Sequence, residues 1–299
     1  MKKLLGGIAV LLSLGSIGAG VWKARPKIFL LAATVCLGCA SLAASTVAQT
    51  NDLAAANAFL NAGLYDRAVS ILEKLSTQGD GVAAYTLAEL YFKGIGVVRD
   101  HPKAASLYEL AADKNIMNAE QNIAVMYVNG DGVKQDFVRA VYWFRRAAMQ
   151  GDSFAQLSLG YRYKFGQGVQ QDYAQAMEWL KKAAAQDQVS AFYEIGMMYA
   201  EGKGVQQDHR EAAAWTRRAA DAGYAPAQFN MGVANWNGDG VSRDLVQAYL
   251  WFALALIRYE DDESRSHAEN ALRQVASRLS KTQLSKADAA VRQWLSEHR

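Results

Sequence analysis

The hydrophobic pattern of this chain repeats every 36 residues between about residues 79 and 258. Within each repeat the apolar positions follow helical spacing twice. Ala155, Leu159 and Tyr163 form the first such series in the third repeat, and residues 176–183 contain the second. Each repeat therefore predicts two helices, and the series of repeats predicts an all-α protein.

The tetrapeptide Gly-x-Gly-Val separates the two predicted helices of every repeat. We expect Gly166 or Gly168 to adopt a positive φ and end the first helix, because a side chain there would cost about 1–2 kcal/mol. Asp172 is then placed to cap the second helix, and loss of such a cap costs about 1 kcal/mol. The middle residue of the tetrapeptide varies between repeats, which argues against a calcium ligand, and no phosphate-loop Gly-Lys-Ser/Thr follows it. The tetrapeptide begins at Gly94, Gly130, Gly166, Gly202 and Gly238, and the capping aspartates are Asp100, Asp136, Asp172, Asp208 and Asp244.

Aromatic residues recur at the same step. Each unit of a solenoid contacts only its neighbours, so positions that recur report packing and positions that vary are free for recognition. We therefore expect the recurring rings to be core. They are Tyr91, Tyr127, Tyr163 and Tyr199 in one column and Trp143, Trp179, Trp215 and Trp251 in another.

These repeats resemble the Sel-1-like repeat, a relative of the tetratricopeptide repeat with a longer loop between its helices. The family pattern Ala-x-x-x-Leu-Gly-x-x-Tyr-x-x-Gly-x-Gly-Val-x-x-Asp-x-x-x-Ala-x-x-Trp-x-x-x-Ala-Ala matches residues 155–184 almost throughout. The departures are small: Ala88 and Ala124 replace the Gly of the first helix, and Leu107 replaces the Trp. The resemblance implies a right-handed α-solenoid that serves as a protein- or peptide-binding scaffold, commonly in bacterial envelopes. It implies no chemistry.

The ends of the array are expected to be helical caps, which solenoids need. Residues 49–78 are predicted to form a tetratricopeptide-like helix pair, residues 79–258 the five repeats, and residues 259–299 C-terminal capping helices. In the last segment we expect one helix from about Ser264 to Leu279. A capping box at Ser280 and Gln283 is then expected to start a final helix that ends near Trp294.

Residues 1–48 have the composition of a leader. Residues 4–22 and 28–48 are uncharged apolar runs, and the second has the basic flank and small-residue tail of a secretory signal. Cleavage after Ala48 is expected, with an uncleaved membrane anchor as the alternative. The first run is either a further membrane segment or a sign that synthesis begins near Val21. Each version predicts a periplasmic or secreted protein, anchored to the inner membrane if the leader is retained.

The charge, cysteine and histidine content and the absence of catalytic motifs argue against several classes of function. Five of the 32 basic residues and none of the 29 acidic residues lie in residues 1–48, so the remainder has a slight negative charge and no footprint for nucleic acid. Both cysteines, Cys36 and Cys39, lie in the leader, which excludes a disulfide scaffold or Cys nucleophile in the folded part. His101 and His209 share a column at the start of a helix, where we expect no second ligand. No His-Glu-x-x-His, Gly-x-Ser-x-Gly or Ser-x-x-Lys motif occurs. We predict neither catalysis, nor a cofactor, nor a metal.

The variable columns of the first helices are poor in charge and rich in aromatic residues. We expect these helices to line the concave face, where an exposed apolar stripe would bind an extended peptide or a partner's helix. The alternative is that neighbouring repeats bury part of these columns. The predicted contacts are Tyr85, Phe92, Tyr161, Phe165, Tyr193, Phe229 and Trp236.

The sequence therefore predicts a non-catalytic binding scaffold of a bacterial envelope. One alternative is a membrane-tethered assembly factor or virulence-related adaptor that keeps its leader. Another is an enzyme that acts on cell-wall or β-lactam compounds.

Overall fold

The computed structural model describes residues 51–298, and all regular secondary structure in that range is helical. The chain divides into two compact units whose boundary falls between Ile71 and Leu72, inside α3 (Tyr65–Thr77). The predicted leader over residues 1–48 lies outside the described residues. Within the described range no helix has the length and apolar character that crossing a membrane requires.

The unit that ends at Ile71 contains helical residues 51–61 and the first half of α3. Gly63, with a φ of 72°, makes the turn between them. Ala56 and Ala68 are fully buried. Both helices lie within residues 49–78, for which the sequence predicts a tetratricopeptide-like pair.

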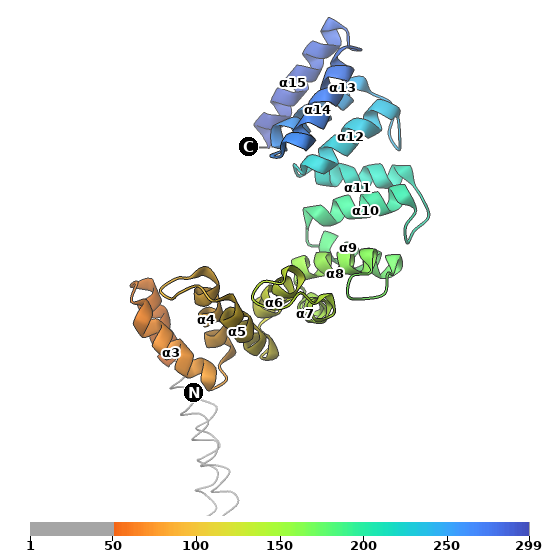
Figure 1. The fold of residues 1–299 in the computed structure, drawn as a ribbon. Coiled ribbons are helices and arrows are strands. Elements are labelled where there is room, and N and C mark those ends of the chain that lie inside the picture. Colours follow the sequence, from red (N-terminus) through yellow and green to blue (C-terminus); the bar gives the residue numbers. More distant parts are fainter. Residues whose placement is uncertain (1–50, 299) are drawn as a thin grey trace, which may run out of the picture. The chain divides into compact units, whose positions relative to one another are not determined.

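Five helical hairpins follow in the unit that begins at Leu72 (Figure 1). Each first helix packs against the second helix of its own repeat, and each second helix packs against the first helix of the next repeat. The predicted all-α repeat architecture is therefore confirmed. The first helices are α4 (Gly81–Lys93), α6 (Met117–Asn129), α8 (Ser153–Phe165), α10 (Val189–Glu201) and α12 (Ala225–Asn237). The second helices are α5 (His101–Asp113), α7 (Phe137–Met149), α9 (Tyr173–Ala184), α11 (His209–Asp221) and α13 (Leu245–Arg258).

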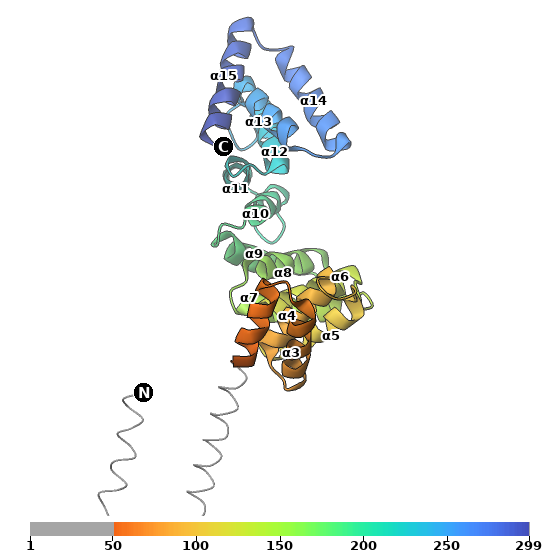
Figure 2. The same ribbon diagram turned by 90° about the vertical axis from the view of Figure 1, so that its left-hand side faces the viewer.

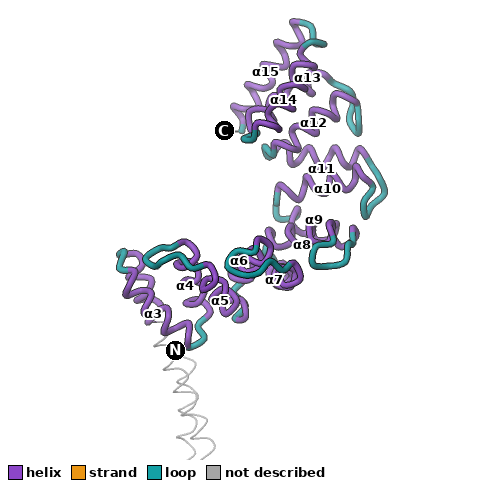
Figure 3. The backbone as a smooth tube through the Cα atoms, viewed as in Figure 1, coloured by secondary structure: helices purple, strands orange, loops and turns teal. Residues whose placement is uncertain are grey.

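The loop inside each hairpin has the same construction throughout (Figure 3). In the third repeat Gly166 ends α8 in the left-handed conformation, and the Asp172 side chain accepts a hydrogen bond from the Gln175 N–H at the start of α9. The Asp172 N–H donates to the Tyr163 carbonyl at 3.0 Å, which closes the loop. Both sequence predictions, the glycine C-cap and the aspartate N-cap, are confirmed.

In the second to fifth repeats, the second glycine of Gly-x-Gly makes the contact with the preceding repeat. Gly168 has a φ of 75°, and a Cβ built on it would lie 2.1 Å from the carbonyl oxygen of Phe137, the first residue of α7 in the preceding repeat. Backbone therefore meets backbone, with no room for a methyl group. The same approach recurs at Gly132, Gly204 and Gly240, which face the backbones of His101, Tyr173 and His209.

The recurring aromatic columns pack between repeats, as expected, but to different depths. Trp143 and Trp251 are buried, whereas Trp179 and Trp215 are only half-buried. The Lys182 ammonium lies 3.9 Å from the centroid of the Trp179 ring. Such a cation–π contact adds about 0.5–1 kcal/mol at an exposed site.

The C-terminal cap consists of α14 (Asp262–Ala276) and α15 (Lys281–Glu297), which pack on either side of α13 (Figure 2). Trp294 of α15 joins the apolar cluster that contains Trp251, and Val275 of α14 joins the cluster that contains Phe252. The predicted capping box at Ser280 and Gln283 is present at the start of α15. This end of the array is therefore covered by two helices.

A pair of substitutions two residues apart tests the contact between repeats. Gly168→Ala should lower the free energy of unfolding by about 2–5 kcal/mol, since it combines left-handed strain with the clash against the Phe137 carbonyl. Gly166→Ala should cost only about 1–2 kcal/mol, because its φ of 66° imposes similar strain but its Cβ would meet nothing closer than 3.3 Å. Urea unfolding followed by circular dichroism measures both. Equal losses would show that close approach to α7 is not a constraint.

Candidate binding site

The seven predicted contact residues lie on first helices, and six of them are only half-buried rather than open. Phe165 is the exception, with 56% of its surface exposed. The six rings are therefore partly covered by their neighbours, which is the alternative that the sequence left open, and their contact with a partner stays a prediction. We call the junction between two successive repeats a step.

Two of these residues pack around one ring of α5. The Tyr85 and Tyr108 ring centroids are 5.9 Å apart, and those of Phe92 and Tyr108 are 6.3 Å apart. The other neighbour of Phe92 is His101, stacked at 4.8 Å with an interplanar angle of 16°. Tyr108 itself is almost fully buried. Tyr108 therefore packs α5 against Tyr85 and Phe92 of α4.

The middle of the array pairs its predicted residues differently. Tyr161 and Phe165 stack on each other at 6.3 Å, both from α8. Tyr193 of α10 meets Tyr224, the N-cap residue of α12, edge to face at 5.3 Å. Of these rings Phe165 offers the most surface to a partner.

Phe229 and Trp236 lie at the C-terminal end of the array. Their rings contact Phe252 at 5.2 Å and 6.4 Å, and the Arg278 guanidinium lies 4.6 Å from the Trp236 ring. Both line an open pocket of about 340 Å³ between α12, α13 and α14, to which α14 contributes His267.

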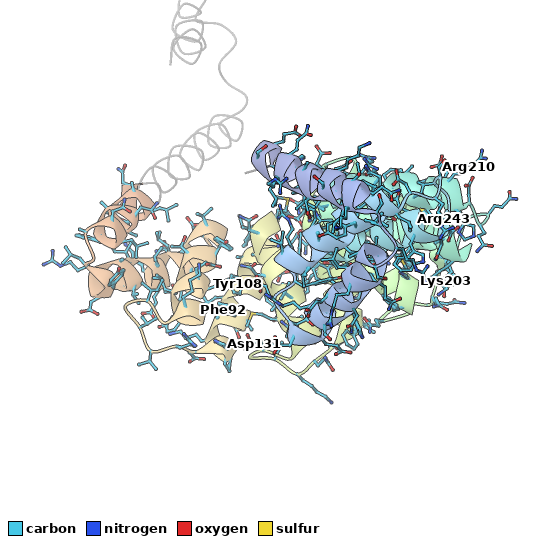
Figure 4. The ribbon with its side chains drawn as sticks, turned by 90° about the horizontal axis from the view of Figure 1, so that it is seen from above. Phe92, Tyr108, Asp131, Lys203, Arg210 and Arg243 are labelled. Carbon is cyan, nitrogen blue, oxygen red and sulfur yellow. The ribbon has the colours of Figure 1, made fainter. Side chains whose placement is uncertain are left out.

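A second pocket, which we call the first-repeat pocket, lies between α4, α5 and α6. Its volume is about 330 Å³. Figure 4 shows Phe92, Tyr108 and Asp131 gathered from α4, α5 and the loop after α6. The remaining lining residues are Glu89, Lys93, Asn122, Val125, Met126 and Asn129.

An equivalent pocket, which we call the fourth-repeat pocket, lies three repeats further along, between α10, α11 and α12. It is smaller, about 170 Å³. Asn230, Val233 and Asp239 line it at the positions of Asn122, Val125 and Asp131. The same step between repeats therefore makes a pocket at both places, with some side chains kept and others changed.

Sequence reasoning missed a polar column on the first helices. Asn122 Nδ2 donates to Glu89 Oε1 at 3.0 Å, and Asn230 Nδ2 donates to the Tyr193 hydroxyl at 3.3 Å. Each of these bonds links one repeat to the next. The column recurs at the 36-residue step, so it was open to detection. Its members are Thr86, Asn122, Ser158, Glu194 and Asn230.

The charge in this column is buried. Glu194 Oε2 accepts from Lys164 Nζ at 2.7 Å, and the two side chains are only 11% and 10% exposed. Glu194 Oε1 also accepts from the Tyr161 hydroxyl at 3.1 Å. Burial, reinforced by this carboxylate, raises the pKa of Tyr161. Lys164 occupies the same position of its repeat as Phe92 and Trp236, and its side chain is held between α8 and α10.

His101 and His209 each lie beside one aspartate, although the sequence led us to expect no second ligand there. His209 Nδ1 lies 3.0 Å from Asp239 Oδ1, and His101 Nδ1 contacts Asp131 Oδ1 in the same way. Each pair joins the start of a second helix to the loop of the following repeat. Among residues 51–298 no group of three or more His, Cys, Asp or Glu side chains could hold a metal ion.

Stacked hairpins with a constant packing core and variable pockets at the steps define a helical-repeat scaffold. Residues 81–116, 118–152, 153–188, 189–224 and 225–256 match the Sel1 repeat family, which amounts to more than half of the chain. The protein therefore belongs to the Sel1 repeat family, whose members commonly mediate protein–protein interaction.

One solved structure of this family has the same fold, and a second is a weaker match. A Sel1 repeat protein from Oxalobacter formigenes is 25% identical, with a TM-score of 0.64 over 74% of this chain and 99% of that one. The protein c5321, a protective antigen of uropathogenic Escherichia coli with an SLR fold, is 24% identical, with a TM-score of 0.39 over 86% of this chain and 71% of that one. No curated protein matches the chain.

The buried pair yields a stability prediction with an internal control. Lys164→Met leaves Glu194 charged and buried without its ammonium, so we expect a loss of about 3–5 kcal/mol in the free energy of unfolding. Adding Glu194→Gln should restore most of it, because the amide is neutral and can still accept from Tyr161. Lys203→Met, which removes an exposed pair with Glu201 of similar length, 2.8 Å, should change the free energy of unfolding far less, because solvent screens exposed pairs. Similar losses for Lys164→Met and Lys203→Met in urea unfolding would contradict the assignment.

Proposed function

We propose that this chain is a non-catalytic scaffold that binds a partner polypeptide along the face formed by its first helices. The observation that carries the proposal is that each repeat contains two sets of residues, one that recurs and packs the array and one that varies and lines the pockets. The glycine turns, capping aspartates and alanines recur at every step, whereas only some of the residues that line the pockets at the steps are kept and others change. A repeat scaffold recognises partners through the positions that its packing leaves free.

The chemistry of this face suits a peptide. Apolar walls such as Val125 and Val233 alternate with amides such as Asn122 and Asn230, which can hydrogen-bond a peptide backbone. An extended segment would place side chains in successive steps while its main chain follows the amides. We further propose that the partner is met along the concave side of the array and that no covalent bond is made or broken there.

We propose a site of action in the bacterial envelope. The support is the sequence of residues 1–48, with its basic flank, apolar centre and small-residue tail. If that segment is retained as an anchor, the same scaffold would act as a membrane-tethered adaptor. Sequencing the N-terminus of the protein recovered from the periplasm separates the two versions.

Phe165 gives the clearest test of the binding face, because Tyr161 and Trp236 also hold the fold together. Peptides selected from a random display library on the full chain should bind the Phe165→Ala variant about tenfold more weakly, as is typical for loss of an aromatic anchor. Tyr142 on the second helix α7 is the matched control, since it is another aromatic residue with 53% of its surface exposed. Tyr142→Ala should leave binding unchanged, and both variants should keep their helicity. Binding that depends on Tyr142 and not on Phe165 would place the partner on the other face.

A further inference from the structure

We propose that the first-repeat pocket takes an arginine side chain of the bound polypeptide. This inference rests on the proposed function and deepens it, because it names the chemistry of one residue of the partner. It starts from the charges, rings and volume that α4, α5 and α6 bring together.

The charges inside the pocket do not cancel. Glu89 already has three partners, since it accepts from Tyr108, from Asn122 and from Lys93. Its charge is thus offset by the Lys93 ammonium. Among the described residues, the partner of the Asp131 carboxylate is a histidine, His101, and the Asp131 side chain remains 34% exposed. The charged residues that line the pocket are two carboxylates and one ammonium, so the lining carries one net negative charge.

The walls of the pocket suit a long side chain with a flat, cationic end. Val125 and Met126 offer an apolar surface to methylene groups. Phe92 is held by stacking on His101, beside the carboxylate that His101 contacts. A guanidinium can pair with a carboxylate and lie against an aromatic ring at the same time, whereas an ammonium is a compact point charge. Arginine therefore fits this combination better than lysine.

The volume is sufficient for such a side chain. At about 330 Å³ the first-repeat pocket is nearly twice the size of the fourth-repeat pocket, about 170 Å³. Thr216 stands in the latter where Tyr108 stands in the former, and Ala200 where Phe92 stands. The fourth-repeat pocket thus keeps the histidine–aspartate pair but lacks the aromatic wall.

Asp239 pairs with His209 at the pocket that lacks the aromatic wall. Figure 4 shows Lys203, Arg210 and Arg243 of that part of the chain apart from the group of Phe92, Tyr108 and Asp131. Asp239 is therefore a matched aspartate without the ring that the proposal requires, which makes it a control within the same chain.

The test uses peptides selected from a random display library on the full chain. The selected pool should be enriched in arginine. Asp131→Asn, which keeps the shape and the contact with His101, should weaken binding about tenfold, equivalent to about 1.4 kcal/mol. Asp239→Asn should change affinity by less than about twofold. Affinity for the unaltered chain should also fall as salt is raised, since the pair is partly exposed.

Replacing the peptide arginine by citrulline, which has the same shape and no charge, identifies the partner of Asp131. Citrulline should weaken binding to the unaltered chain about tenfold and should have almost no effect on the Asp131→Asn variant, because the two changes remove one interaction. Selected peptides that need Phe165 but tolerate Asp131→Asn would overturn the arginine site and leave the scaffold function standing. Failure to select any peptide would overturn both. Equal losses from Asp131→Asn and Asp239→Asn would also refute the assignment.

Discussion

The approach of one backbone to another at the second glycine of the loop, in the second to fifth repeats, sets the geometry of the array. At Gly168 the space for a Cβ is already taken by the Phe137 carbonyl, 2.1 Å away, and at Gly240 the His209 carbonyl would be 1.9 Å away. Such a contact has no side chain that could adjust, so it fixes how each hairpin sits on the one before it. Interiors built at this density transmit strain rather than absorb it. The loop is thus a spacer of fixed size, repeated without insertion.

That fixed step decides which side chains meet. His101 contacts Asp131 and Lys164 contacts Glu194, and both pairs are 30 residues apart. Tyr161 and Glu194, like Asn122 and Glu89, are 33 apart. Contacts between repeats therefore recur at offsets of 30 and 33, whereas the sequence repeats at 36. The backbone geometry is thus the same at every junction between repeats. Which interaction forms there depends on the two residues that lie 30 or 33 positions apart.

The sequence could predict the frame because every packing residue recurs in register. The capped hairpins, the glycine turns and the capping box at Ser280 follow from local chemistry, and the structure has them. Burial of the predicted binding residues could not be predicted in the same way. Lys164 occupies the same position of its repeat as Phe92 and Trp236, but it is buried against Glu194 of the next repeat. Single-column reasoning finds positions that vary and does not find what they face.

The same reasoning separates positions that vary because they are free from positions that vary in pairs. Glu194 and Lys164 differ from their counterparts in other repeats, yet they satisfy each other and leave nothing for a partner. Asp131 contacts a histidine, and within the described residues no lysine or arginine is paired with its partly exposed carboxylate. Phe165 has an exposed ring beside Tyr161. Recognition on this scaffold therefore belongs to residues whose partner across the step is absent or incomplete. A position that varies between repeats can therefore be a packing position as easily as a binding position, unless the residue that faces it in the next repeat is also considered.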